Sequence, residues 1–143
     1  MKLGKAVKKG KKKVGTAAKK TQKVSQKAAV NTGQVVSNAG IVTTQVGKVL
    51  QDDRVSGGIG SAVTYATGDE QKGYIATQTS EDVGATMESS GRVMKHSGRG
   101  LKQVGRGHGK KAGKQGDKSL AKADKVDLER AARGSAGLTL LFG

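Results

Sequence analysis

The chain has 143 residues and a formal net charge of +16, with 23 glycines, two Tyr, one Phe, no Trp, no Pro and no Cys. Because large apolar side chains are too few to fill the core of a compact domain, we predict an extended chain that a partner orders. The lack of Cys excludes disulfides and thiol catalysis, and no run of about 18 apolar residues exists to span a membrane.

The charges are segregated along the chain. Residues 1–50 hold 12 of the 27 basic residues and no acidic one, whereas residues 51–89 hold 7 acidic and 2 basic residues. Residues 90–116 hold 8 basic residues and no acidic one, and residues 117–143 are nearly balanced. We therefore divide the chain into a lysine-rich arm, a mildly acidic middle, a basic Gly-rich segment and a C-terminal segment. Such segregation favours a polyanionic partner.

Residues 1–50 are predicted to form an amphipathic helix. The stretch TQKVSQKAAVN–TGQVVSNAGIV–TTQVGKVLQDD, residues 21–53, repeats every eleven residues. Eleven residues make three turns at about 3.67 residues per turn, close to the 3.6 of an α-helix, so one stripe stays on one side. We expect this apolar stripe to face a protein partner or a membrane, through Val24, Val35, Val42, Val46 and Leu50.

The middle segment is predicted to begin with a break. The stretch QDDR at 51–54 ends the first helix, and GGIG at 57–60 follows as a flexible segment. Residues 61–80 have two readings: a short β-hairpin turning at Gly68-Asp69, or a continued irregular helix. Ser80, with acidic residues after it, is predicted to cap the next helix.

The C-terminal third is predicted to hold one ordinary helix. Residues 98–116, rich in Gly and cations, are expected to be loop or extended chain. Residues 117–133 are expected to be helical, with Gly134 as the stop. The apolar tail either anchors in a neighbouring subunit or packs back on helix 117–133, through Leu138, Leu140, Leu141 and Phe142. The predicted fold class is mostly α, with extended amphipathic helices, Gly-rich breaks and little compact core.

No motif in the sequence predicts catalysis. The Gly113-Lys114 pair lacks the rest of a phosphate-binding loop, because His108 stands at the first Gly position and Gln115 at the Ser/Thr position. The stretch GGIGSA fails the dinucleotide pattern, because Val63 occupies the last Gly position. His96 and His108 have no carboxylate nearby in sequence, and no metal-ligand spacing exists. We predict a protein that is not an enzyme and has no catalytic residue, cofactor or metal site.

The two cationic segments are the candidate binding residues. Lysine acts as a point charge rather than a bidentate reader of bases, so binding to phosphates would be indifferent to sequence and steep in salt. Nucleic acid is the favoured polyanion. The alternatives are an anionic membrane under residues 1–50, or acidic surfaces of neighbouring proteins in an assembly. The predicted phosphate contacts are Lys8, Lys9, Lys11, Lys12, Lys13, Lys19, Lys20, Arg99, Arg106, Lys110 and Lys111.

Two resemblances add to these expectations. The start MKLGKAVKKGKKKVGTAAKKTQKV and the later GKKAGKQGDKSL resemble the small basic tail and internal virion proteins of short-tailed bacteriophages. This resemblance implies a structural or accessory role in a virion, and a location in the virion or the cytoplasm. Residues 21–53 resemble the repeats of synucleins, perilipins and group 3 late-embryogenesis-abundant proteins. Those families carry Glu on the polar face, which is absent here, and the difference favours a polyanion. No secretory signal is expected, because no apolar segment follows the N-terminal lysines.

Overall fold

The computed structural model describes residues 2–143, with side chains described from Gly15 onward. The described residues form five helices and no strand, which confirms the mostly α fold class. The helices are α1 (Lys2–Gln51), α2 (Asp53–Thr67), α3 (Glu70–Gly105), α4 (Gly109–Ala123) and α5 (Leu128–Phe142).

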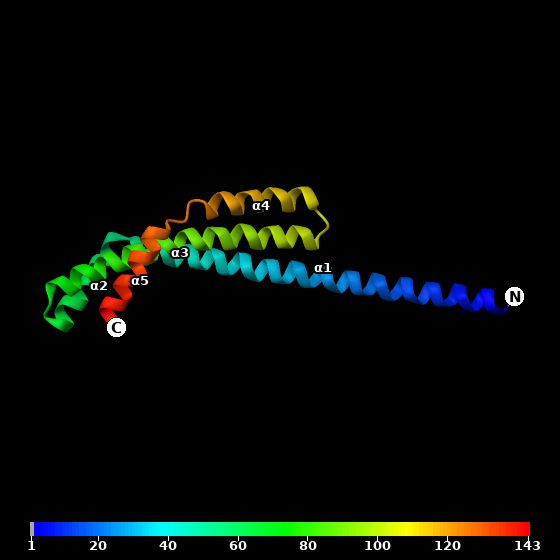
Figure 1. Ribbon diagram of the computed structural model, residues 1–143, viewed down its shortest axis with the longest axis horizontal. Helices are drawn as coiled ribbons and strands as arrows, with labels where there is room; N and C mark the ends of the chain where they lie inside the picture. Colours follow the sequence, from blue (N-terminus) through cyan, green and yellow to red (C-terminus); the bar gives the residue numbers. More distant parts are fainter. Residues whose placement is uncertain (1) are drawn as a thin grey trace.

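Helix α3 is the centre of the fold. All four other helices pack against it, and α1 also contacts α2 where the two adjoin. Helices α1 and α2 run antiparallel to α3 one after the other, while α4 and α5 return along other sides of it, so that α3 lies between α4 and α1 (Figure 1). The result is a long, thin bundle, from which the N-terminal half of α1 projects.

A tight turn at Gly68-Asp69 joins α2 to α3. Gly68 has φ 68°, a left-handed conformation that favours glycine, and its N–H donates to the carbonyl oxygen of Thr64. The Asp69 side chain then accepts hydrogen bonds from the backbone N–H groups of Gln71 and Lys72, which caps α3. The predicted turn position is therefore right, but the β-hairpin is wrong: residues 61–80 form two antiparallel helices.

Three other predicted breaks are also wrong. Helix α1 does end at Gln51, but residues 57–60 lie inside α2 rather than in a flexible segment. Ser80 lies in the middle of α3, where its hydroxyl donates to the carbonyl oxygen of Leu50 at 2.9 Å. Residues 98–116 are helical apart from a short turn at 106–108. Glycine costs about 1 kcal/mol per residue in an isolated helix. Close packing against another helix offsets that cost at Gly60 and Gly98, but not at Gly57 or Gly113, where an added Cβ atom would meet nothing within 4 Å.

The predicted helix 117–133 is two helices. Helix α4 ends at Ala123, and α5 starts after Asp127, whose side chain accepts a hydrogen bond from the backbone N–H of Arg130. Gly134 does not stop a helix, because it lies buried within α5 against Val83. The apolar tail is the last part of α5, and this helix packs on α3 rather than back on residues 117–133.

Glycines spaced seven residues apart hold α1 against α3. A Cβ atom added to Gly33, Gly40 or Gly47 would lie 2.5 Å from the carbonyl oxygen of Gly98, Gly91 or Gly84, respectively. No real Cβ atom approaches an oxygen so closely, so the two backbones touch only because these positions lack side chains. The antiparallel direction brings the two sets of glycines into register along the whole contact.

The helix interfaces are built from small residues. Ala76 is the buried hydrophobic residue of the described chain, and the other buried side chains are polar, chiefly the hydroxyl residues Ser37, Thr44, Ser56, Thr79 and Ser80. Thr44, for example, donates to the carbonyl oxygen of Gly40 at 2.8 Å, one turn earlier in the same helix. Among the described residues, every buried side-chain nitrogen and oxygen has a hydrogen-bond partner. Close backbone contact thus replaces the large side chains that the sequence lacks.

Candidate polyanion-binding surface

The N-terminal half of α1 extends beyond the rest of the bundle. The last residue of α3, Gly105, lies against Gln26 and Val30 of α1. Side chains of residues 15–28 are exposed, and a Cβ atom added to Gly15 would meet no packed neighbour within 4 Å. Figure 1 shows this part of α1 as a single projecting helix. We call residues 2–25 the arm; at 1.5 Å per residue it is about 36 Å long.

The arm presents lysines to solvent. Lys19 and Lys20, two of the predicted phosphate contacts, are exposed, and so are Lys23 and Lys27, which the predicted set omits. The remaining predicted lysines of the arm lie outside the residues whose side chains are described; these are Lys8, Lys9, Lys11, Lys12 and Lys13.

The turn between α3 and α4 brings the second cationic segment to the base of the arm. Arg99, Arg106, Lys110 and Lys111 are all exposed. Because Gly105 lies against Gln26, the turn that follows Gly105 lies beside the base of the arm, where α1 leaves the bundle. Two basic segments that are far apart in sequence therefore meet where the arm leaves the bundle (Figure 1).

The first turn of α4 is electrostatically unfavourable by itself. It holds Lys110 and Lys111 and no acidic residue, and His108 precedes it without a side-chain capping hydrogen bond. The N-terminus of a helix carries partial positive charge, so cations there repel it. A bound anion would relieve this repulsion.

Packing of the helices adds basic residues that the predicted set missed. Lys95 of α3 lies close to Gly40 of α1, and burial lowers its pKa from the usual value. The nearby charges of Arg99, Arg92, Lys122 and Lys48 lower this pKa further. Lys102, one heptad after Lys95, donates to the side-chain oxygen of Gln34. The feature of the sequence that could have identified these two lysines is their spacing, because each lies four residues after one of the glycines spaced seven residues apart.

Few of these cations have a carboxylate partner. Among the residues with described side chains, the ion pairs are Arg92 with Glu88 and Arg130 with Asp82. No acidic residue occurs in 1–51 or in 89–116. Among the residues whose side chains are described, the exposed cations of the arm and of the adjacent turn therefore have no carboxylate partner.

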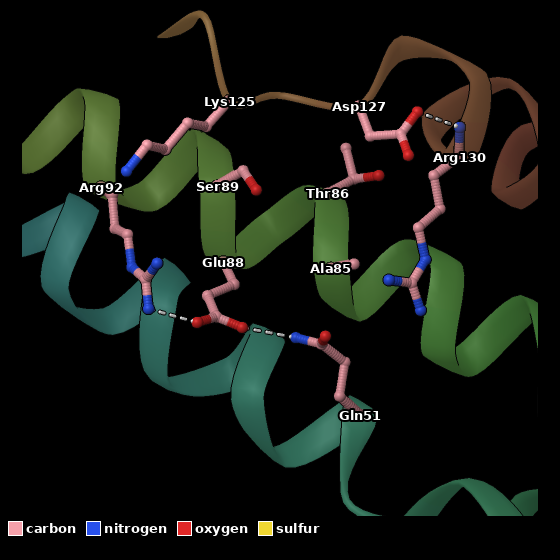
Figure 2. Close-up of a pocket in the computed structure, with 9 residues that line it drawn as sticks. All are labelled: Gln51, Ala85, Thr86, Glu88, Ser89, Arg92, Lys125, Asp127 and Arg130. Carbon is pink, nitrogen blue, oxygen red and sulfur yellow. Dashed lines mark hydrogen bonds and ion pairs between the residues drawn. The ribbon is translucent and has the colours of Figure 1, made fainter. Parts of the chain in front are cut away.

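A polar cavity of about 220 Å³ lies where α1, α3 and the start of α5 meet (Figure 2). Gln51 donates to one carboxylate oxygen of Glu88 at 2.7 Å, and Arg92 pairs with the other. Arg130 of α5 forms an ion pair with Asp82 of α3, with 2.9 Å between the arginine Nε and the carboxylate oxygen. These cations are matched by carboxylates, so the cavity is a polar junction between helices rather than a further anion site.

The predicted partner face divides into two parts. Val24, Val35, Val42 and Val46 are exposed on α1, and Leu50 is half-buried. At the other end of the molecule, α5 lines an apolar cavity of about 200 Å³ with Leu138, Leu141 and Phe142, together with Leu50 of α1 and residues of α2 and α3. Leu140 and Phe142 are largely exposed.

Comparisons with protein-family models, with curated proteins and with solved structures found no match to this chain. Within the described residues, no helix combines the length and the apolarity that crossing a bilayer requires. The same residues hold no group of three or more His, Asp or Glu side chains placed to bind a metal ion. The predicted role in a virion and the prediction that the chain is not an enzyme remain predictions.

Proposed function

We propose that this chain is a non-enzymatic accessory protein that binds nucleic acid through the phosphate backbone, within a larger assembly such as a virion. The arm and the α3–α4 turn bind the phosphates. The rest of the bundle holds these two segments together and presents its own surfaces to neighbouring subunits.

One observation carries this proposal: the fold brings two acid-free segments together, and the exposed cations there whose side chains are described have no carboxylate partner. The length of the arm supports it, because about 36 Å matches one turn of duplex DNA, roughly 34–36 Å. Each phosphate that a lysine neutralises releases counterions, and this release drives binding.

Binding is expected to be indifferent to base sequence. Lysines do not read base edges by bidentate hydrogen bonds. The exposed aromatic side chains of Tyr65 and Tyr74 lie on α2 and at the start of α3, at the end of the bundle remote from the arm (Figure 1). They are therefore not placed to stack on bases of a strand that the arm holds.

Titration of a short duplex DNA across a salt series tests the proposal. We expect the logarithm of the association constant to fall linearly with the logarithm of the salt concentration. Replacing Lys19, Lys20, Lys23 and Lys27 by Gln should make that slope shallower by about 3 to 4, at roughly 0.9 per phosphate contact. The matched control removes four charges elsewhere, with Arg54→Gln, Lys72→Gln, Lys125→Gln and Arg133→Gln.

Two results would contradict the proposal. Equal losses in the two quadruple variants would show that only net charge matters and not the arm. No binding of DNA at about 0.15 M salt, where exposed charges are largely screened, would leave acidic surfaces of neighbouring proteins as the partners of the cations.

A further inference from the structure

The outward face of α1 carries a line of exposed valines. Val24, Val35, Val42, Val46 and Val49 are between 41% and 68% exposed. At about 100° per residue, these valines fall within an arc of about 60°. Gly33, Gly40 and Gly47, which contact α3, lie roughly 140° to 180° from Val24 on the same basis. We call these five residues the valine stripe.

The valine stripe reverses the usual arrangement of a protein in water. Helix α1 buries glycines and hydroxyl residues against α3 and leaves the valines of the stripe outside, although Val30, beside Gly105, is half-buried. Helices α4 and α5 pack on α3 and not on α1, so no element of the described structure covers the stripe. Small residues between helices and larger apolar residues outside are typical of helices that meet lipid.

Charge identifies the surface that the stripe fits. Lys20, Lys23, Lys27 and Lys48 lie about 40° to 120° to one side of Val24 around the helix. No acidic residue occurs in 1–51, so every charge on this flank is positive, and between Lys27 and Lys48 the flank carries the neutral side chains of Gln34, Asn38 and Gln45. A helix with an apolar stripe beside a lysine flank lies in the interface of an anionic bilayer, with its apolar side chains at the acyl boundary and its ammonium groups at the phosphates.

A second copy of the chain fits the stripe less well. Val35, Val42 and Val49 are spaced as the first core position of a coiled coil, but Asn38 and Gln45 occupy the second core position, which should be apolar. The net charge of +16 also repels another copy. The eleven-residue spacing of Val24, Val35 and Val46 keeps the stripe straight, and a straight stripe suits a flat surface.

We infer that the valine stripe docks α1 onto a bilayer surface that contains anionic lipid, with the helix axis parallel to that surface. This interaction goes beyond the binding of nucleic acid, because most of the stripe lies on the bundle rather than on the arm. Only Val24 falls within the arm, but the lysine flank of the stripe includes Lys20, Lys23 and Lys27, which the proposed contact with DNA also uses.

Co-sedimentation of the full chain with vesicles tests the inference. The vesicles contain phosphatidylcholine with phosphatidylglycerol, or phosphatidylcholine alone, at about 0.15 M salt. We expect binding only to the anionic vesicles. The variant Val35→Ser/Val42→Ser/Val49→Ser should bind them at least about tenfold more weakly, because binding scales with the apolar area buried. Its affinity for duplex DNA should be unchanged.

The control variant is Asn31→Ser/Asn38→Ser/Gln45→Ser, which changes the same number of positions beside the stripe and should bind vesicles as the wild type does. Val35→Ala/Val42→Ala/Val49→Ala removes less apolar area without lowering helix propensity, and should show an intermediate loss. Circular dichroism checks that each variant keeps its fold.

Three results would overturn the inference. The serine variant could bind anionic vesicles as tightly as the wild type, which would assign the contact to the lysines alone. The wild type could fail to bind anionic vesicles. It could also form a dimer, measured by analytical ultracentrifugation, that the serine variant does not form. Failure of the DNA titration would leave this inference standing, since the serine variant changes only the valine stripe, whereas Lys20, Lys23 and Lys27 serve both proposed contacts.

Discussion

At the scale of single residues, the heptad glycines set the distance between α1 and α3. A side chain at any of them would collide with backbone, which cannot move aside as a flexible side chain does. This separates them from glycines such as Gly113 on α4, where an added Cβ atom meets nothing within 4 Å. The two kinds look identical in the sequence.

A pair of substitutions distinguishes these two kinds of glycine. Gly40→Ala should lower the free energy of unfolding by about 1–3 kcal/mol, because it forces the helices apart. Gly113→Ala should raise it by about 0.5–1 kcal/mol through better helix propensity. Urea unfolding followed by circular dichroism measures both, and equal stability of the two variants would refute the close contact.

His96 gives the fold a dependence on pH. Burial lowers its pKa, against a smaller raising effect of the hydrogen bond between its Nδ1 and the Gln115 oxygen, 3.1 Å apart. The charges of Lys95, Arg99 and Lys118 lower the pKa further. The folded state therefore binds fewer protons here than the unfolded state, whose His titrates near pH 6.5. Stability should fall as the pH drops below about 6.5.

Urea unfolding between about pH 5 and pH 8 checks this dependence. His96→Gln should flatten the acid side of the profile, whereas His108→Gln, which alters an exposed ring, should leave it in place. A profile that both variants share with the wild type would assign the acid sensitivity to other groups.

At the scale of elements, the turn at Gly68-Asp69 fixes the register of the α2–α3 hairpin. The glycines spaced seven residues apart do not by themselves set the register of α1 on α3, because sliding α1 by seven residues along α3 would again pair glycine with glycine. The left-handed conformation of Gly68 ends α2 and the Asp69 cap begins α3, so these two residues fix the length of the turn. The Gly68-Asp69 turn therefore sets the register of the helices, and the glycines pack in that register.

Removal of the cap tests the strength of this local signal. Asp69→Ala should lower the free energy of unfolding by about 1 kcal/mol, since the backbone N–H groups of Gln71 and Lys72 both lose their acceptor. Glu70→Ala, one residue along and exposed, serves as the control and should change stability by less than about 0.5 kcal/mol. A similar loss in both variants would point to the helix dipole rather than to the cap. Thermal and urea unfolding measure the difference.

At the scale of the whole molecule, positive and negative charges lie toward opposite ends. The arm and the α3–α4 turn form a cationic end, and 7 of the 11 acidic residues lie between residues 52 and 88, on and around α2 and the first half of α3, toward the opposite end (Figure 1). Among the described side chains, the cations of the cationic end have no carboxylate partner, so they repel one another in the folded state. This self-repulsion predicts how the free chain responds to salt.

Salt should stabilise the chain in the absence of a partner. Between about 0.01 M and 0.15 M NaCl, where the screening length shrinks from about 30 Å to about 8 Å, the melting temperature should rise by a few degrees. The Lys19, Lys20, Lys23 and Lys27 to Gln variant should show a smaller rise. A melting temperature that falls with salt would mean that attractive ion pairs dominate.

Much of the architecture follows from local patterns. The lack of proline and the long repeat predicted α1, and Gln51 and the Gly68-Asp69 pair marked real ends of helices. The errors at 57–60, at 98–116 and at Gly134 have one cause, because intrinsic propensity predicts a break at each of these glycines. Gly98, Gly105 and Gly134 are instead buried where helices touch, a tertiary effect that no local signal shows.

By itself, the sequence determined the helical class, the segregation of charge and the eleven-residue stripe on α1. Only the tertiary structure decided which face of α1 is buried. Hydrophobic periodicity points to the valines, yet α3 takes the glycine face, because paired glycines let two backbones touch along several turns. The structure also decided that the end of α3 lies at the base of the arm, because the antiparallel hairpin brings Gly105 against Gln26.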